Sequence, residues 1–273
     1  QIRGEYGPYT QSERAAIYQT FALDMVKQGK AYICFASQEE LDSIAAEQER
    51  LGVTKGCYGE WSIWRNAEPE RVLEEIQKGT PFVIRLKNDT VPGQSTEFKD
   101  YIKGGTKQLV DHNDVVLIKS QREDRNGQPI YLPTYHFAHV IDDHLMRTTH
   151  VIRGAEWLSS TALHMKLFEV MGWKAPVYGH IATIDTKEIG PDGKEIQRKL
   201  SKRKDTEKAL VSSHFERGYP PVAVEAYLLS ILDSQFEVWR LANPHKPLSE
   251  YAFSAKGIKK SNNALYDADK LAS

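Results

Sequence analysis

The amino-acid sequence predicts an α/β protein that contains a parallel sheet. After Pro133 helical and strand-like patterns alternate, which is typical of chains in which helices connect parallel strands. Beyond about Thr206 the pattern is mostly helical, so a helical segment is expected to follow the sheet. The elements expected between these points are helices over 134–146 and 160–172, a buried strand over 149–154 and a further strand over 178–185.

The part of the chain before Pro133 combines helix and strand signals with irregular, turn-rich stretches. Capping boxes, in which threonine or serine is followed three residues later by glutamate, predict helix starts at Thr10 and Ser37. Pro69 is expected to open another helix, and the pair Asn126-Gly127 predicts a tight turn between two strands. Further strands are expected over 31–35, 81–87 and 114–119.

Length and composition indicate a globular protein without an overall bias toward nucleic acid. The 273 residues are 40% hydrophobic and 27% charged, and the formal net charge is -1. Any anion site must therefore come from local clusters, and two basic clusters are present, at 198–204 and 256–260. No apolar run is long enough to cross a membrane. Cys34 and Cys57 are expected to be reduced thiols, so the prediction is a cytoplasmic protein with no membrane partner.

The stretch RKLSKRKD, residues 198–205, is the main candidate for an anion-binding segment. It ends a glycine-containing loop, predicted over 185–204, that comes directly after a strand. Open α/β sheets bind ligands beyond the carboxyl ends of their strands, which favours a ligand-binding loop over an ordinary solvated surface. Gly190 and Gly193 are expected to let this loop move when its ligand binds.

Several segments resemble one family of enzymes. K-L-S-K-R, residues 199–203, is similar to the motif of class I aminoacyl-tRNA synthetases usually written KMSKS. The longest segment is LPTYHFAHVIDDHLMRTTHVIRGAEWLSSTALHMKLFEVMGW, at 132–173. The others are 4–35, 81–87, 95–104 and 263–271. In this order they resemble the glutamyl-tRNA synthetases of the bacterial type, and the resemblance covers nearly the whole chain.

The resemblance implies a domain organisation and a set of partners. The expected fold is the second half of a class I, Rossmann-type catalytic domain with an α+β insertion for the tRNA acceptor end. The expected activity is ATP-dependent activation of L-glutamate and its transfer to tRNA(Glu), with Mg²⁺ accompanying ATP, in a monomer. The implied parts are the end of the first Rossmann half (1–29), the acceptor insertion (30–128), the second Rossmann half (129–205) and a helical stem-contact segment (206–273).

The resemblance also implies the residues of the site. The planar guanidinium of Arg153 is expected to bind the side-chain carboxylate of glutamate at two points, which lysine cannot copy; the structural alternative makes it only a partner of Glu156. Lys202 is expected to make the main phosphate contact, because fixed cations stabilise the charge that develops on a triphosphate. The full set is Tyr135, His139, Arg153 and Glu156 for glutamate, Trp157, Leu158, Ser201 and Lys202 for ATP, and Lys199, Lys202 and Arg203 for catalysis.

A metal site is not expected. The cluster His136, His139, Asp142, Asp143 and His144 matches no recognised zinc spacing, and a polar helix beside a pocket explains it more simply. Some glutamyl synthetases carry a zinc site in the acceptor insertion. Here two thiolates without companion ligands cannot close a tetrahedral site, so no structural zinc is predicted.

Class I synthetases carry a second ATP motif, H-I-G-H or a variant, and no H-x-G-H occurs in this chain. In the family this motif precedes the segment that begins at residue 4. The sequence therefore predicts a fragment or truncated paralogue, inactive alone in ATP–pyrophosphate exchange. The alternatives are a non-catalytic module that binds the tRNA acceptor end, a tRNA-modifying paralogue that transfers glutamate, and a glutaminyl enzyme.

Overall fold

The structure, a computed structural model, falls into two compact units that are described here one at a time. It describes residues 4–124, 126–255, 257–261 and 263–272, so Arg125 of the predicted turn region and Lys256 of the second basic cluster lie outside the described residues. Unit 1 comprises 1–96, 107–149 and 160–176, and unit 2 comprises 97–106, 150–159 and 177–273. The domain boundaries implied by the resemblance stay a prediction.

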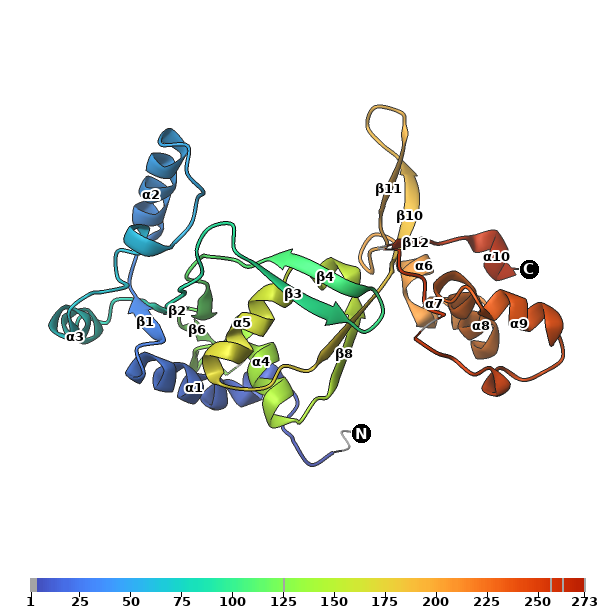
Figure 1. Ribbon diagram of the computed structural model, residues 1–273, viewed down its shortest axis with the longest axis horizontal. Helices are drawn as coiled ribbons and strands as arrows, with labels where there is room; N and C mark the ends of the chain where they lie inside the picture. The colour runs from blue at the N-terminus through green and yellow to red at the C-terminus, as the bar shows by residue number, and fades with distance from the viewer. Residues whose placement is uncertain (1–3, 125, 256, 262, 273) are drawn as a thin grey trace. The chain divides into compact units, whose positions relative to one another are not determined.

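Unit 1 packs helices against a small antiparallel sheet (Figure 1). The sheet has the order β1-β2-β5, from β1 (Ala31–Cys34), β2 (Val83–Leu86) and β5 (Val116–Ile118). The short pair β6 (Arg122–Glu123) and β7 (Pro129–Ile130) flanks the turn predicted at Asn126-Gly127, which is confirmed. The helices are α1 (Ala15–Lys27), α2 (Gln38–Arg50), α3 (Pro69–Gln77), α4 (Tyr135–Leu145) and α5 (Thr161–Met171).

The main core of unit 1 lies between this sheet and helices α1, α4 and α5. Leu86 and Leu117 from the sheet meet Phe137 and Leu167 from the helices, and all four side chains are fully buried. Each such side chain contributes roughly 1.5–3 kcal/mol through the loss of apolar surface from water. The helical spacing of apolar residues in the sequence therefore predicted α4 and α5 correctly.

The two predicted capping boxes have different outcomes. Ser37 accepts a hydrogen bond from the Glu40 amide at 3.2 Å, and the Glu40 carboxylate accepts one from the Ser37 amide at 2.7 Å, so this box is confirmed. The box predicted at Thr10 is wrong, because the chain there forms a 3-10 turn over Gln11–Arg14 without a side-chain cap. A 3-10 turn bonds residues three apart through the backbone, here from Glu13 to Thr10, and leaves no role for the threonine hydroxyl.

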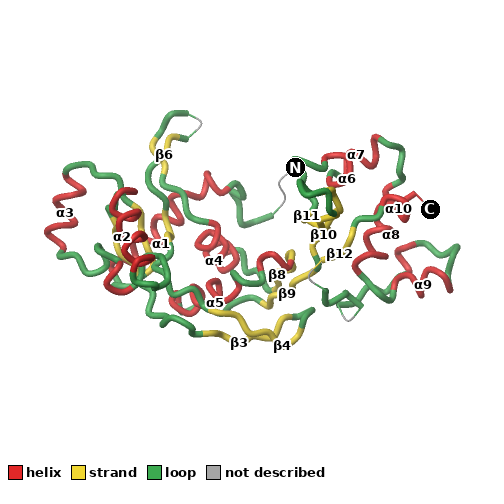
Figure 2. The backbone as a smooth tube through the Cα atoms, turned by 90° about the horizontal axis from the view of Figure 1, so that it is seen from above, coloured by secondary structure: helices red, strands yellow, loops and turns green. Residues whose placement is uncertain are grey.

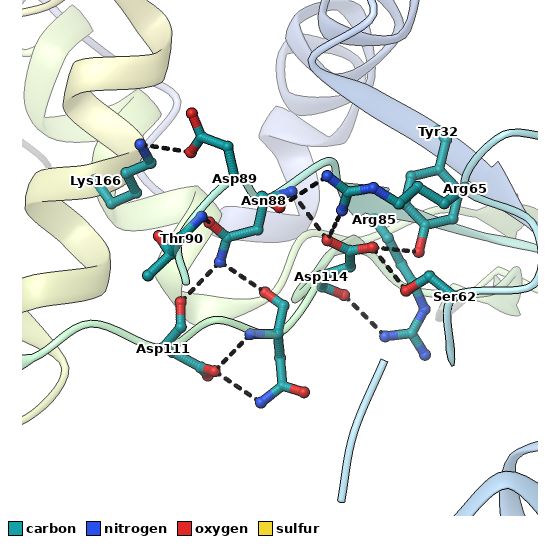
Figure 3. A network of polar contacts seen from close by, with 11 residues as sticks. Tyr32, Ser62, Arg65, Arg85, Asn88, Asp89, Thr90, Asp111, Asp114 and Lys166 are labelled. Carbon is teal, nitrogen blue, oxygen red and sulfur yellow. Dashed lines mark hydrogen bonds and ion pairs between the residues drawn. The ribbon is translucent and has the colours of Figure 1, made fainter. Parts of the chain in front are cut away.

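A buried carboxylate, Asp114, connects strand β1 with two loops of unit 1 (Figure 3). Its oxygens accept hydrogen bonds from the Tyr32 hydroxyl at 3.0 Å, the Ser62 hydroxyl at 2.7 Å and the backbone amide of Asn88 at 2.9 Å. Arg65 supplies the opposite charge through an ion pair to the same carboxylate. Because the Asp114 side chain is 0% exposed, its charge depends on these partners for its stabilisation.

Replacing Asp114 with alanine is expected to lower the free energy of unfolding by roughly 3–5 kcal/mol, because the Arg65 charge loses its buried partner. Urea denaturation followed by circular dichroism measures the change. Asp24→Ala is a matched control at an exposed carboxylate of α1, where a change within about 0.5 kcal/mol is expected. Equal destabilisation by the two variants would contradict the role assigned to Asp114.

Unit 2 contains the parallel strands that the sequence predicts. Strands β8 (His150–Gly154) and β9 (Val177–Ile181) pair in parallel, with Arg153 opposite His180, and helix α5 lies between them in the sequence. A parallel pair requires such a long connection. The prediction that β8 is buried is wrong, since Ile152 at its centre is 52% exposed. An apolar run of this length fits both a buried strand and a half-covered one.

The loop predicted over 185–204 is in large part a β-hairpin. Strands β10 (Thr183–Ile189) and β11 (Glu195–Lys199) pair antiparallel, and β12 (Asn263–Leu265) adds to β10 in parallel (Figure 2). Gly193, with a φ of 76°, closes the turn by donating to the Gly190 carbonyl at 3.0 Å. Cross-strand ion pairs, including one from Arg198 to Glu188, support this hairpin. Its side chains are mostly polar, so no hydrophobic alternation marked the strands.

The regular structure after the hairpin is mostly helical, as predicted, with β12 as the exception in the described residues. Its helices are α6 (Thr206–Ala209), α7 (Val211–Glu216), α8 (Pro221–Leu232), α9 (Phe236–Ala242) and α10 (Ala268–Ala272). The strands β3 (Ser95–Asp100) and β4 (Gly104–Leu109) form a separate two-stranded sheet whose connecting turn belongs to unit 2. None of the helices in the described part of the chain combines the length and apolar character needed to span a membrane.

Candidate functional site

Arg153 lies near the carboxyl end of β8 with its guanidinium held on several sides. Its Nε donates a hydrogen bond to Nε2 of His180 at 3.0 Å, and its Nη2 donates to the Trp157 carbonyl at 3.2 Å. The guanidinium carbon lies 4.8 Å from the ring centre of Tyr178, over the face of the ring. A guanidinium oriented in this way is suited to bidentate recognition of a carboxylate.

Glu156 connects the arginine region to the basic motif. It lies in a 3-10 turn (Ala155–Trp157) directly after β8 and forms an ion pair with Lys199, the last residue of β11. The two side chains are 34% and 57% exposed, so the pair contributes little to stability. Its importance is positional, because it brings the two predicted motifs together within unit 2.

The turn after β11 is organised by Asp205. Its carboxylate accepts two hydrogen bonds from Arg198, at 2.7 and 2.9 Å, and one from the Ser201 amide at 2.8 Å. These contacts lower the pKa of Asp205 to about 2, the bond from Arg198 being the largest cause. The Ser201 hydroxyl accepts hydrogen bonds from the amides of Arg203 and Lys204. Ser201 therefore has a role within the turn, and its predicted contact with ATP stays a prediction.

Lys202 and Arg203 are exposed on this turn. The Arg203 amide donates to the Ser201 hydroxyl and the Lys202 carbonyl accepts from the Thr206 hydroxyl, so the backbone of the turn is held while both side chains are exposed. Such a turn presents cations at defined positions and leaves them accessible to a polyphosphate.

Asp205→Asn is expected to loosen this turn. An amide can accept only with its oxygen, so the two-point bond to Arg198 is lost and the Ser201 amide loses a charged acceptor. Because the pKa of Asp205 is lowered, its ionised carboxylate stabilises the turn fully at pH values above the ordinary pKa of aspartate. This stabilisation is lost as the pH falls through about 2 and the carboxylate is protonated. We expect the Ser201 amide proton to exchange with solvent roughly tenfold faster, as measured by hydrogen-exchange NMR. Asp192→Asn, at the exposed hairpin turn, is the control and should leave this exchange rate unchanged.

The predicted residues Tyr135 and His139 belong to unit 1, at the start of α4. Tyr135 is 43% exposed and stacks on the His139 ring, with 5.9 Å between the ring centres. Nδ1 of His139 lies 3.0 Å from the Asp143 carboxylate. Beneath them, the fully buried His164 lies 2.9 Å from His136, measured between Nε2 and Nδ1. His139 is thus a neighbour of Tyr135 inside a packed histidine cluster.

The other polar residues of α4 have partners of their own. Asp142 accepts hydrogen bonds from Arg14 at 2.8 Å and from the Tyr18 hydroxyl at 2.6 Å, and His144 stacks on Trp173. In the ranges that the structure describes, no group of three or more histidine, cysteine or acidic side chains is placed to hold a metal. The thiols of Cys34 and Cys57 are free, and burial raises the pKa of Cys57.

Sequence reasoning missed four residues that shape the site. Asp205 and Arg198 lie in the charged stretch 198–205. The sequence shows that both residues are charged, but it does not show that they pair with each other. Asp100 and His180 are 80 residues apart, and no spacing rule connects them. Together with the parallel strands and the exposed lysine turn, these contacts give unit 2 of this α/β protein a cluster of positioned cations, which suits anionic ligands.

Comparison with known proteins specifies this class. The family model described as "tRNA synthetases class I (E and Q), catalytic domain" matches residues 1–234, and the chain belongs to this family. It is 45% identical to the glutamate–tRNA ligase of Acetivibrio thermocellus over 268 residues, which are 98% of this chain and 46% of that protein. It is also 44% identical to the glutamate–tRNA ligase of Sorangium cellulosum over 281 residues, 99% of this chain and 47% of that protein.

A solved structure gives the same result for the fold. The crystal structure of a glutamate tRNA ligase from Elizabethkingia meningosepticum, in complex with its amino acid, is similar with a TM-score of 0.75 at 32% sequence identity. The match covers 98% of this chain and 53% of that chain. The chain therefore spans about half the length of the relatives it matches, and the predicted synthetase fold is confirmed.

Proposed function

We propose that this chain is the part of a glutamate–tRNA ligase that binds glutamate and the phosphates of ATP. In this reaction the α-carboxylate of glutamate attacks the α-phosphate of ATP, pyrophosphate leaves, and the glutamyl group then passes to the terminal ribose of tRNA(Glu). The observation that carries the proposal is Arg153, whose guanidinium is held next to a segment that pairs with the lysine motif.

In the proposed site Arg153 binds the side-chain carboxylate of glutamate with two parallel hydrogen bonds. Trp157 and Leu158 lie against the adenine, and the selection of the amino acid by Tyr135 and His139, which belong to unit 1, stays a prediction. Lys202 contacts the phosphates, and Lys199 and Arg203 add positive charge as pyrophosphate departs. Mg²⁺ would accompany ATP as part of the substrate. A cytoplasmic location and a monomeric state stay predictions.

Glutamate-dependent ATP–pyrophosphate exchange tests the proposal. Because the chain spans about half of its relatives, residues 1–273 should replace the matching segment of the Acetivibrio thermocellus ligase, with which they share 45% identity. We expect the chimaera to catalyse exchange with L-glutamate, in the presence of tRNA(Glu), and not with L-glutamine. Exchange that prefers glutamine would assign the chain to the glutaminyl branch. A stable chimaera without exchange with either amino acid would refute the proposed activity.

A further inference from the structure

Behind Arg153 lies a buried polar pair, Asp100 and His180, which are 1% and 0% exposed. Oδ1 of Asp100 accepts hydrogen bonds from the amides of Ile102 at 2.9 Å, Lys103 at 2.8 Å and His180 at 3.3 Å. Its Oδ2 lies 2.6 Å from Nδ1 of the His180 ring. The carboxylate is thus fixed by the β3–β4 turn, and one edge of the imidazole is fixed by the carboxylate.

The chemistry of these atoms determines where the protons lie. Burial opposes the charge on Asp100, but the bonds from Lys103, His180 and Ile102 outweigh it and lower its pKa, so the carboxyl group is ionised. Burial, together with the nearby charges of Arg153 and Lys103, lowers the pKa of His180, so the ring is neutral. An ionised carboxylate only accepts hydrogen bonds, so the single ring proton must be on Nδ1. The lone pair on Nε2 then accepts the Nε–H of Arg153, at 3.0 Å.

We propose that Asp100 and His180 are positioning residues that set the orientation of the Arg153 guanidinium for the substrate carboxylate. The His180 imidazole accepts a hydrogen bond from Nε of Arg153, and the Trp157 carbonyl accepts one from Nη2. The Tyr178 ring covers one face of the guanidinium. The plane of the fork is therefore fixed before substrate binds, which reduces the entropy lost on binding. The inference rests on the proposed function of Arg153 as the glutamate-binding residue.

Asp100→Asn separates this role from a structural one. The amide oxygen can keep the bonds from the three backbone amides, while the amide nitrogen must donate to Nδ1 of His180. The ring proton then moves to Nε2, so that two N–H donors face each other at the Arg153 contact. The same exchange produces the wrong tautomer in the Ser-His-Asp triad of hydrolases. Arg153 should turn away although the surrounding backbone is retained.

Long-range ¹H–¹⁵N spectra of the 273-residue chain report this tautomer directly. In the wild type we expect a protonated Nδ1 on His180 and an Arg153 Nε–H that exchanges slowly with solvent. In Asp100→Asn we expect a protonated Nε2 and rapid exchange at Arg153. Asp269→Asn, an exposed carboxylate of α10, is the control and should leave both signals unchanged. An unchanged tautomer and an unchanged Arg153 signal in Asp100→Asn would overturn the proposal.

A pH titration of the wild type needs no variant and therefore applies even if Asp100→Asn does not fold. The charged and titratable groups that face His180 are Asp100, Lys103, Arg153 and Tyr178. Its pKa is lowered, so protonation of the ring should begin only below the ordinary value for histidine. Protonation makes Nε2 a donor, so the Arg153 Nε signal should move together with the His180 titration. A ring that titrates while the Arg153 signal stays constant would contradict the proposed contact.

Steady-state kinetics of the Acetivibrio thermocellus chimaera test whether the orientation of Arg153 affects the binding of glutamate. In Asp100→Asn we expect the KM for glutamate to rise about 100-fold, as for a misplaced binding group, with the KM for ATP unchanged. An unchanged KM for glutamate in an active chimaera would overturn the positioning role even if the tautomer changes. If the wild-type chimaera shows no glutamate-dependent exchange, the proposed function fails, while the spectra still decide whether the pair orients Arg153.

Discussion

Arg153→Lys is expected to reduce kcat/KM for glutamate in ATP–pyrophosphate exchange by at least about 100-fold. Lysine keeps the positive charge but replaces a planar fork by a single ammonium group, so the two-point contact with a carboxylate is lost. Lysine also has no Nε–H group to donate to Nε2 of His180, so the side chain loses the hydrogen bond that holds it in place. Most of the loss should appear in the KM for glutamate. Steady-state exchange kinetics of the chimaera measure it.

Arg50→Lys is the matched control, because Arg50 is exposed on α2 and forms an ion pair with Glu47 on the same helix. It should leave both kinetic constants unchanged. If Arg153→Lys also retains wild-type KM and kcat, then Arg153 does not bind the substrate. Arg153 would then have a structural role only, through its hydrogen bonds to His180 and to the Trp157 carbonyl.

Lys202→Ala is expected to lower kcat for glutamate activation by about 10²–10³-fold, the usual effect of removing one group that stabilises charge in a transition state. Lys202 is exposed on a turn that Asp205 and Ser201 hold in place, so its loss removes charge without removing packing. The thermal midpoint should therefore stay unchanged. The KM for glutamate should change little, because in the proposed site Arg153, and not Lys202, binds that substrate.

Lys204→Ala is the control for this variant, since Lys204 is an exposed lysine in the same turn. Rapid-quench measurement of adenylate formation separates the chemical step from substrate binding. Similar rates for Lys202→Ala and Lys204→Ala would show that the turn acts through its overall charge. The specific role of Lys202 would then be wrong.

The elements that the sequence predicted well are those with strong local signals. Helices α4 and α5 follow from apolar residues at helical spacing, and the turn at Asn126-Gly127 follows from the backbone preferences of these residues. The hairpin of β10 and β11 lies largely within the predicted loop 185–204, because most of its side chains are polar and its strands therefore lack hydrophobic alternation. Charged strands of this kind lack the alternation on which strand prediction depends.

Candidate site residues could be predicted from the sequence only where they lie within a contiguous motif. Arg153 and the K-L-S-K-R lysines are recognisable in the sequence because each lies in an unbroken segment that resembles a family. Asp100 and His180 could not be connected in this way, since their contact is created by the pairing of β8 with β9 and by the β3–β4 turn. Buried polar pairs have no periodic signature, so only the folded chain reveals them.

A crystal structure of the chimaera with a non-hydrolysable analogue of glutamyl-adenylate tests the central claim most directly. We predict that the side-chain carboxylate of the analogue accepts two hydrogen bonds from Arg153, at about 2.7–2.9 Å, while Arg153 Nε remains bonded to His180. The sulfamoyl or phosphate end should lie within reach of Lys202. A carboxylate bound elsewhere, with Arg153 directed away from the analogue, would contradict the account.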